Sequence, residues 1–266
     1  MSERKLLVNY KAENGIATLT MDDPPANTYT HQMMRDLDEG ILKARFDDGV
    51  HVIVITGQGE KFFSAGANIS MLNDVTPKFK YFFCLHANET LNRLEHTPKL
   101  VIAALNGHTV GGGLEIAMAA DMRIARKGAG KIGLPEVSLG VLPGTGGTQR
   151  LSRLVGKAQA IELCCGGRTF DMEEAQTMGL VNQVIEGDHA SFMKKVYEYA
   201  GTFCPPNRAS FAVGMIKRSI QSGMEVPFEQ GLVVERELQA QLFSSGDAKE
   251  GINAYVTKRK AQFKGC

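Results

Sequence analysis

Two glutamates lie in segments whose other residues are typical of a packed interior. Glu115 belongs to the apolar run GGGLEIAMAA, and Glu136 to the tight segment GLPEVSLGVLPG. A lone carboxylate is costly to remove from water, so buried glutamates are usually paired, hydrogen-bonded or neutral. Two carboxyl groups in one pocket repel each other, which favours a proton on one of them while the other stays ionised. Such a pair could perform acid/base chemistry on water.

Glycine-rich turns near these glutamates predict a pair of free backbone amides. In NGHTVGGGLEIAM the glycines allow the main chain to approach a ligand closely, and the run opens a helix whose first N–H groups have no internal partner. The turn FSAGANIS could present another amide, that of Ala67. If the amides of Ala67 and Gly112 converge they form an oxyanion hole, in which one donor is worth about 2.7 to 4 kcal/mol. A thioester carbonyl that becomes an enolate would suit such a hole.

Alternating strand-like and helix-like segments predict an α/β core that holds these groups. Residues 6–22 are typical of a hairpin with its turn at Glu13-Asn14-Gly15. The pattern predicts helices over 31–47 and 79–96, and strands over 50–57, 100–105 and 121–127. Parallel strands joined through helices place ligand sites at the strand ends, and we expect both glycine turns to follow those strands.

The second half of the chain is mostly helical in pattern. Asp171 followed by Glu174 resembles the start of a short helix that Gly179 closes. Further helices are predicted around 191–203, 210–221, 228–243 and 247–263, with a break at Pro205-Pro206. We therefore expect a core with the active site over residues 1–200 and a helical oligomerisation region over 201–266. Helices that cannot bury their apolar faces alone dock on their own core or on a neighbouring subunit.

Composition excludes several classes of function. The chain has 266 residues, enough for one large α/β domain, and 30 basic against 29 acidic residues without a run of like charge. This balance argues against nucleic acid or a membrane surface as partner. Five cysteines without CxxC spacing favour reduced thiols and no zinc site. The charged start MSERKLLVNY lacks the features of a signal peptide, so we expect a cytoplasmic protein.

The motifs together resemble the enoyl-CoA hydratase/isomerase, or crotonase, superfamily over essentially the whole chain. The matching segments, in family order, are FFSAGANI, NGHTVGGGLEIAMAADMRIA, GLPEVSLGVLPGTGGTQRLSRLVG, GLVNQV and EGINAYVTKRKAQF. The resemblance implies an α/β fold with a crotonase-like core of repeated ββα units and a C-terminal α-helical trimerisation region. It also implies a homotrimer or homohexamer and an acyl-CoA substrate. No metal and no cofactor besides the coenzyme A of the substrate are expected.

Within this family, members that hydrate 2-enoyl thioesters carry a glutamate in each of two motifs, and the matching residues here are Glu115 and Glu136. The resemblance implies that one carboxylate activates water for addition at C3 while Glu136 delivers a proton to C2. The enolate would be held by the amides of Ala67 and Gly112. Other positions that the resemblance places against the substrate are Ala65, Gly66, Asn68, Ile69, Met71, Gly111, Pro135, Gly144 and Lys258.

Two features of the sequence bear on the substrate. Asn68 stands where many family members carry Asp, which predicts a different contact near the coenzyme A entrance. The segment 71–86 corresponds to a region that shapes the acyl pocket in relatives. Its bulky residues would suit a short or ring-shaped acyl group, although apolar residues at helical spacing are more often plain core; they are Met71, Leu72, Phe79, Tyr81, Phe82 and Phe83.

Simpler interpretations stand beside each of these roles. Glu115 could only compensate the positive end of its own helix, and Glu136 could be an exposed turn carboxylate. Gly144 and its neighbours in LPGTGGTQR are typical of turn and helix-start glycines. His108 is more typical of a loop-bonding histidine than of a catalytic base.

Rival functions also remain open at this point. An isomerase, a dehydratase acting on a branched or cyclic acyl-CoA, a thioester hydrolase or a decarboxylase could use the same oxyanion hole. A non-catalytic scaffold or nucleic-acid binder would need a basic groove and dispensable glutamates, which the charge balance and the retained glutamates oppose.

Overall fold

A six-stranded sheet forms the centre of the protein. In the computed structural model, which describes residues 5–266, its strand order is β1-β2-β3-β5-β7-β10. β1 (Val8–Glu13) and β2 (Ile16–Met21) form the predicted antiparallel hairpin, and φ is positive at both Asn14 and Gly15, as a tight turn of this kind requires. The other strands run parallel to β2; they are β3 (Val52–Gly57), β5 (Leu100–Leu105), β7 (Met122–Arg126) and β10 (Gln183–Ile185).

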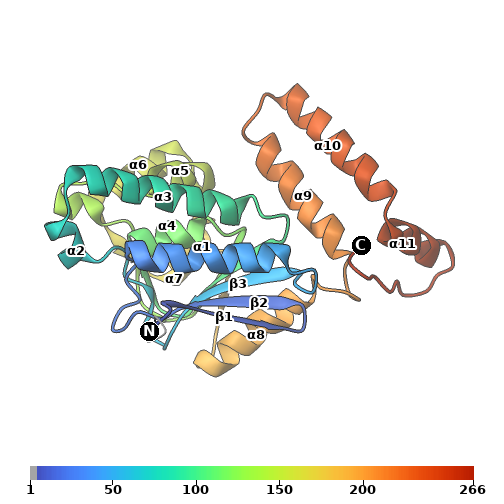
Figure 1. The fold of residues 1–266 in the computed structure, drawn as a ribbon, viewed down its shortest axis with the longest axis horizontal. Helices are drawn as coiled ribbons and strands as arrows, with labels where there is room; N and C mark the ends of the chain where they lie inside the picture. The colour runs from blue at the N-terminus through green and yellow to red at the C-terminus, as the bar shows by residue number, and fades with distance from the viewer. Residues whose placement is uncertain (1–4) are drawn as a thin grey trace.

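Helices cover both faces of this sheet. α1 (His31–Phe46) and α3 (Pro77–Glu95) lie over one face, and α8 (His189–Gly201) lies along the other (Figure 1). Every residue of β3 and β5 is therefore buried, which explains why these strands are continuous apolar runs in the sequence. The predicted α/β fold and C-terminal helical region are confirmed.

A second, smaller sheet positions the glycine turns. It has the order β4-β6-β8-β9, with β4 (Phe62–Ser64), β6 (His108–Val110) and β8 (Ile132–Gly133) parallel and β9 (Thr169–Phe170) antiparallel to β8. The glycine turns follow parallel strands, as expected, but these are β4 and β6 of the second sheet and not the predicted strands over 50–57 and 100–105. β4 and β6 intervene, and they are too short to show a periodic pattern.

The segments that follow these parallel strands lie next to one another. β4 leads to α2 (Ile69–Asp74), β6 leads to α4 (Gly112–Met118), and β8 leads to a 3-10 helix, η1 (Glu136–Leu139). α5 (Gly147–Val155) packs on α4, and α6 (Lys157–Gly166) packs on α5 and η1. α7 (Met172–Thr177) is the predicted short helix, and the Asp171 side chain accepts a hydrogen bond from the Glu174 amide at 2.8 Å.

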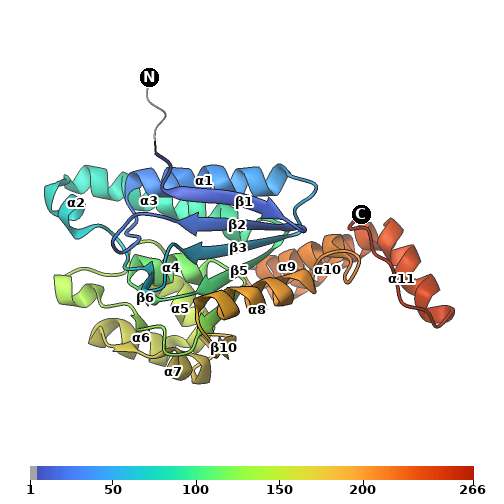
Figure 2. The ribbon, with the colours of Figure 1, turned by 90° about the horizontal axis from the view of Figure 1, so that it is seen from below.

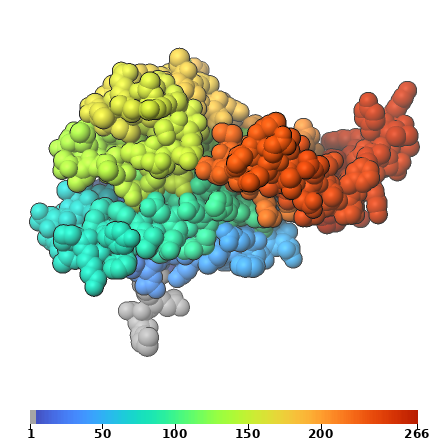
Figure 3. Space-filling model, turned by 90° about the horizontal axis from the view of Figure 1, so that it is seen from above, coloured from blue at the N-terminus to red at the C-terminus, as the bar shows by residue number. Residues whose placement is uncertain are grey.

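The C-terminal helices extend away from this body (Figures 2 and 3). α9 (Ser210–Gly223) and α10 (Phe228–Phe243) pack side by side, and α11 (Gly246–Val256) follows at the far end. α9 is joined to the core by a buried ion pair in which Lys217 Nζ lies 2.8 Å from Asp121 Oδ2.

The last predicted helix is shorter than expected. The sequence pattern predicts helix to residue 263, but α11 ends at Val256 and φ is positive at Lys258. The tail then folds back, because the Asp247 carboxylate accepts hydrogen bonds from the amides of Lys264 and Gly265, both at 2.7 Å. Within residues 5–266, no helix is long and apolar enough to cross a membrane.

Candidate active site

Two glycine turns meet at the carboxyl ends of β4 and β6. Gly66 and Gly111 have positive φ values of 86° and 58°, a region that side chains other than glycine rarely adopt. A Cβ on Gly66 would lie 2.9 Å from the backbone nitrogen of Gly112, so only glycine allows this approach. The structure thus brings the Ala67 turn beside Gly112.

The amides of Ala67 and Gly112 have no acceptor in the part of the chain that the structure describes. Gly112 is the first residue of α4, where a backbone N–H has no intrahelical partner. Ala67 forms an isolated bridge with Tyr29, but that bridge uses the Gly66 carbonyl and the Asn68 amide. Both N–H groups are therefore free to donate to a ligand oxygen.

Glu115 lies on α4 with only 1% of its surface exposed. Its Oε1 accepts hydrogen bonds from the amides of Thr145 and Gly147, each at 2.7 Å, and its Oε2 accepts one from the Thr145 hydroxyl. Burial raises the pKa of the Glu115 carboxyl, and these hydrogen bonds oppose that rise.

Glu115 therefore does not simply compensate its own helix. Its partners Thr145 and Gly147 lie at the start of α5, so its charge faces the N-terminus of a different helix. Gly147 is accordingly more than a helix-start glycine. The sequence reasoning missed Thr145, whose one available signal was its place between the glycines of LPGTGGTQR.

Glu136 begins η1, and its side chain points toward Gly111, whose carbonyl bonds the backbone of Glu115. Its Oε1 lies 2.9 Å from the point where a Cβ on Gly111 would stand, and the Gly111 carbonyl accepts the Glu115 amide at 3.1 Å. Oε2 of Glu136 is buried and has no hydrogen-bond partner. Burial, with a further contribution from the Glu115 charge, raises the pKa of Glu136 to about 7. Glu136 is thus not an exposed turn carboxylate.

The other residues predicted around the first glycine turn surround Ala67. The Ala65 amide donates to the Ala26 carbonyl at 3.0 Å. Asn68 caps α2, because its Oδ1 accepts from the Met71 amide at 2.9 Å. The Asn68 side chain therefore has a capping role in this structure. Ile69 is 56% exposed, while Met71 packs against the main core.

Of the remaining predicted positions, Pro135 and Gly144 lie near the site, and Lys258 lies in a distant segment. Pro135 directly precedes Glu136, and a Cβ on Gly144 would lie 3.3 Å from Cys84 Sγ on α3. Lys258 follows α11 at the far end of the C-terminal helices (Figure 2), so the structure does not bring it to Glu115 within one chain. A role for Lys258 requires a neighbouring subunit and stays a prediction.

His108 is a loop-bonding residue. Its Nδ1 accepts a hydrogen bond from the Lys131 amide at 2.9 Å, and its ring lies 5.3 Å from that of Phe62. Among residues 5–266, no group of three or more His, Cys, Asp or Glu side chains is arranged to hold a metal ion.

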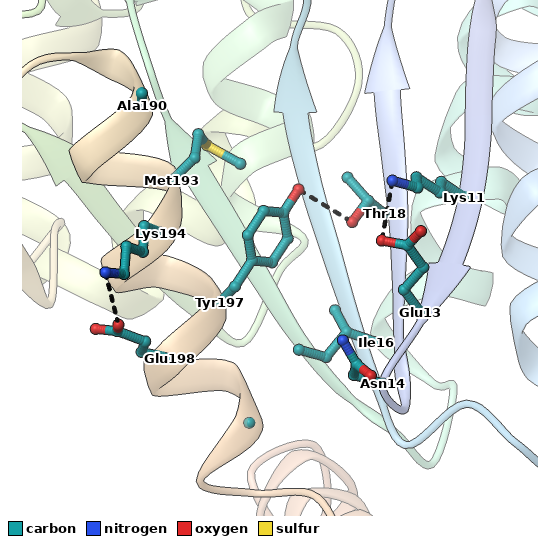
Figure 4. Close-up of a pocket in the computed structure, with 11 residues that line it drawn as sticks. Lys11, Glu13, Asn14, Ile16, Thr18, Ala190, Met193, Lys194, Tyr197 and Glu198 are labelled. Carbon is teal, nitrogen blue, oxygen red and sulfur yellow. Dashed lines mark hydrogen bonds and ion pairs between the residues drawn. The ribbon is translucent and has the colours of Figure 1, made fainter.

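A separate cavity of about 630 Å³ lies between the β1–β2 hairpin and α8 (Figure 4). Its charged groups pair with one another, Lys11 with Glu13 at 2.9 Å and Lys194 with Glu198 at 3.9 Å. All four of these side chains are more than half exposed, and neither Glu115 nor Glu136 lines the cavity. The pair of unlike carboxyl groups beside the free amides is the stronger candidate for chemistry.

Comparison with known proteins gives this arrangement a family. The sequence profile of the enoyl-CoA hydratase/isomerase family matches residues 11–266. The chain belongs to the enoyl-CoA hydratase/isomerase family. It is 37% identical to a probable enoyl-CoA hydratase of Bacillus subtilis, over 97% of this chain and 98% of the relative. It is 38% identical to a short-chain-enoyl-CoA hydratase of Clostridium acetobutylicum, over 94% of each. A crystal structure of an enoyl-CoA hydratase from Geobacillus kaustophilus superposes with a TM-score of 0.95 and 43% identity, covering 99% of this chain and 98% of that one.

Proposed function

We propose that this protein is an enzyme that adds water reversibly across the 2,3 double bond of an enoyl-CoA thioester. The relatives named as hydratases support this reaction, and the one named for short-chain substrates supports a short acyl group. The observation that carries the proposal is the pair of unlike carboxyl groups, Glu115 and Glu136, beside the unpaired amides of Ala67 and Gly112.

In the proposed mechanism the thioester oxygen accepts hydrogen bonds from the Ala67 and Gly112 amides. Glu115 accepts a hydrogen bond from a water molecule and removes its proton as the water oxygen bonds to C3. The electrons of the double bond move toward C2 and the thioester oxygen, and the amides stabilise this enolate. Glu136, whose raised pKa favours the protonated form, delivers its proton to C2. The proton that Glu115 took from water then returns through solvent to Glu136, which resets both groups for the next cycle.

Three finer points are part of this proposal. Coenzyme A enters only as part of the substrate, with no separate cofactor or metal. A homotrimer or homohexamer is supported by exposed apolar residues on the C-terminal helices; these are Ile216, Ile220, Met224, Val233, Phe243, Ile252, Tyr255 and Val256. A cytoplasmic location is supported by the free cysteines.

The experiment that tests the function follows the loss of enoyl-thioester ultraviolet absorbance with linear, branched and cyclic enoyl-CoA substrates, with products identified by mass. A gain of one water, fastest with a short linear substrate, is the expected result. An isomerised, hydrolysed or decarboxylated product without any water gain would show that another reaction uses this site.

A further inference from the structure

Two buried hydroxyl groups, those of Thr145 and Tyr29, form a line of contacts that begins at the Glu115 carboxyl group. The Thr145 hydroxyl bonds Oε2 of Glu115, and the Tyr29 hydroxyl lies 3.4 Å from Thr145 Oγ1. The exposed fractions of Glu115, Thr145 and Tyr29 are 1%, 2% and 3%. The second contact is long for a hydrogen bond between hydroxyl groups, so it is the weaker link of the two.

Tyr29 also contacts both turns that carry the free amides. Its amide donates to the Gly66 carbonyl at 3.0 Å, and its carbonyl accepts from the Asn68 amide at 3.3 Å, which fixes the chain on either side of Ala67. Its ring covers Gly112, because a Cβ there would lie 1.9 Å from Tyr29 Cε1. One side chain thus touches Gly112 and reaches toward the hydroxyl that bonds Glu115.

The direction of the hydrogen bonds follows from counting protons. An ionised Glu115 can only accept, so the Thr145 hydroxyl donates its single proton to it, and Thr145 can then only accept from Tyr29. Burial raises the pKa of Tyr29, so its hydroxyl keeps the proton that this arrangement needs. If Glu115 becomes protonated, both hydroxyl groups can rotate and the line reverses, with Glu115 donating to Thr145 and Thr145 to Tyr29. Glu115 is hydrogen-bonded in both states, and the reversed line leaves the Tyr29 proton without an acceptor among residues 5–266.

We propose that Thr145 and Tyr29 are positioning residues that hold the Glu115 carboxyl group beside the oxyanion amides and keep it hydrogen-bonded both with and without a proton. This inference rests on the proposed function, in which Glu115 takes a proton from water and returns it in each cycle. Neither residue needs to contact the substrate.

Thr145→Val and Thr145→Ser provide the main comparison. Valine removes the hydroxyl but keeps the shape and the backbone N–H that bonds Oε1. The Thr145 hydroxyl bonds a charged group, and hydrogen bonds to charged groups are stronger than those between neutral groups. We therefore expect Thr145→Val to lower kcat by about 10- to 100-fold. KM should change less, because Thr145 acts through Glu115. Thr145→Ser restores the hydroxyl, so its kcat should return to within about threefold of wild type.

Tyr29→Phe removes one atom and is expected to fold, which keeps the test valid if Thr145→Val is unstable. Because the link from Tyr29 is the longer one, we expect a smaller loss of kcat, about 3- to 10-fold. The matched controls are Tyr197→Phe and Thr18→Val, which break a similar Tyr–Thr contact of 3.3 Å in the cavity on the other face of the sheet (Figure 4). Both controls should keep the wild-type kcat.

The pH at which Glu115 titrates gives a readout that does not depend on hydration. The infrared band of its protonated carboxyl group can be assigned by its loss in Glu115→Gln. The midpoint is the pH at which half of this band is lost. It should move to higher pH in Thr145→Val, and by less in Tyr29→Phe, because the ionised form of Glu115 loses a donor. Thr145→Val leaves unchanged the other titratable or charged groups around Glu115, Thr145 and Tyr29. These groups are Tyr29, Lys80, Cys84, Glu136, Arg150 and Cys164.

The outcomes separate this inference from the proposed function. Wild-type kcat and an unmoved Glu115 midpoint in both Thr145→Val and Tyr29→Phe would overturn the positioning role while leaving hydration intact. A shifted midpoint in a protein that hydrates no enoyl-CoA would support the hydrogen-bonded line and reject only the proposed reaction. Equal losses of kcat in Thr145→Ser and Thr145→Val would also contradict the inference, because the hydroxyl would then not be the relevant group.

Discussion

The Glu115 carboxylate accepts three hydrogen bonds, whereas the buried Oε2 of Glu136 has no donor. Donors stabilise an ionised carboxylate. At Glu136 burial is the larger effect and favours a proton, against the opposing hydrogen bond from its own backbone amide. The two groups interact, since the Glu115 charge contributes to the raised pKa of Glu136. This difference is the physical reason for giving them different roles in the proposed mechanism.

The pH dependence of hydration should report Glu136. Its pKa of about 7 means that the protonated form decreases as the pH rises through neutrality. If this proton goes to C2, kcat/KM should fall about tenfold per pH unit on the alkaline side of that pKa. The measurement is kcat/KM for crotonyl-CoA between about pH 5.5 and 9. A profile that stays level to pH 9 would argue against Glu136 as the proton donor.

Glu136 should also lower the stability of the protein at alkaline pH. Its pKa is raised in the folded state, so between the unfolded value and about pH 7 the folded protein binds more protons than the unfolded chain. The free energy of unfolding therefore decreases as the pH rises through this window. Glu136→Gln removes the buried charge, and we expect its Tm at pH 8 to exceed that of wild type by about 2 to 4 °C. The difference should vanish near pH 4, and the exposed-site control Glu198→Gln should show no such difference at either pH.

Gly112 should tolerate no side chain. A Cβ there would lie 1.9 Å from Tyr29 Cε1, so Gly112→Ala must displace the ring or the turn that presents the amide. We expect a loss of about 1 to 3 kcal/mol in the free energy of unfolding, measured by urea denaturation, and a large loss of activity. At Gly201, within α8, an added Cβ meets nothing within 4 Å. Gly201→Ala should be neutral or slightly stabilising, and an equal cost at both positions would refute the steric argument.

The ion pair between Lys217 and Asp121 should stabilise the attachment of α9. Their side chains are 4% and 11% exposed, so Lys217→Met leaves the Asp121 charge in a buried place. We expect a loss of about 3 kcal/mol in the free energy of unfolding. Arg153 and Glu225 form an exposed pair, and Arg153→Met should cost less than about 1 kcal/mol. Similar costs for the two variants in urea denaturation would show that burial of the pair is unimportant.

Local signals explain which parts of the fold were predictable. Asn14-Gly15 specifies a tight turn by itself, and the apolar runs of β3 and β5 follow from burial on both faces. The glycine turns could be predicted as close approaches because only glycine permits their backbone angles. β4, β6 and β8 could not be predicted, since strands of two or three residues depend on pairing with distant partners.

Part of the candidate site could also be predicted from local sequence, and part could not. Glu115 and Glu136 stood out because carboxylates are rare in apolar surroundings. The hydrogen bonds from Thr145 to Glu115 join residues thirty positions apart, and the contact between Tyr29 and Thr145 spans 116 positions. No local pattern encodes either contact. The tail after α11 was mispredicted as helix because its folding back depends on the Asp247 carboxylate and not on apolar periodicity.

In the proposed reaction Glu136 supplies the proton that completes addition of water to an enoyl-CoA. The most direct test compares wild type, Glu136→Gln and the control Glu198→Gln with crotonyl-CoA, measuring kcat and the mass of the product. We predict a product heavier by one water from wild type and the control, and a kcat lower by about 10² to 10⁴ in Glu136→Gln. Tight binding of a non-reactive acyl-CoA by Glu136→Gln would show that the site is intact. Hydration at the wild-type rate by Glu136→Gln would contradict the account.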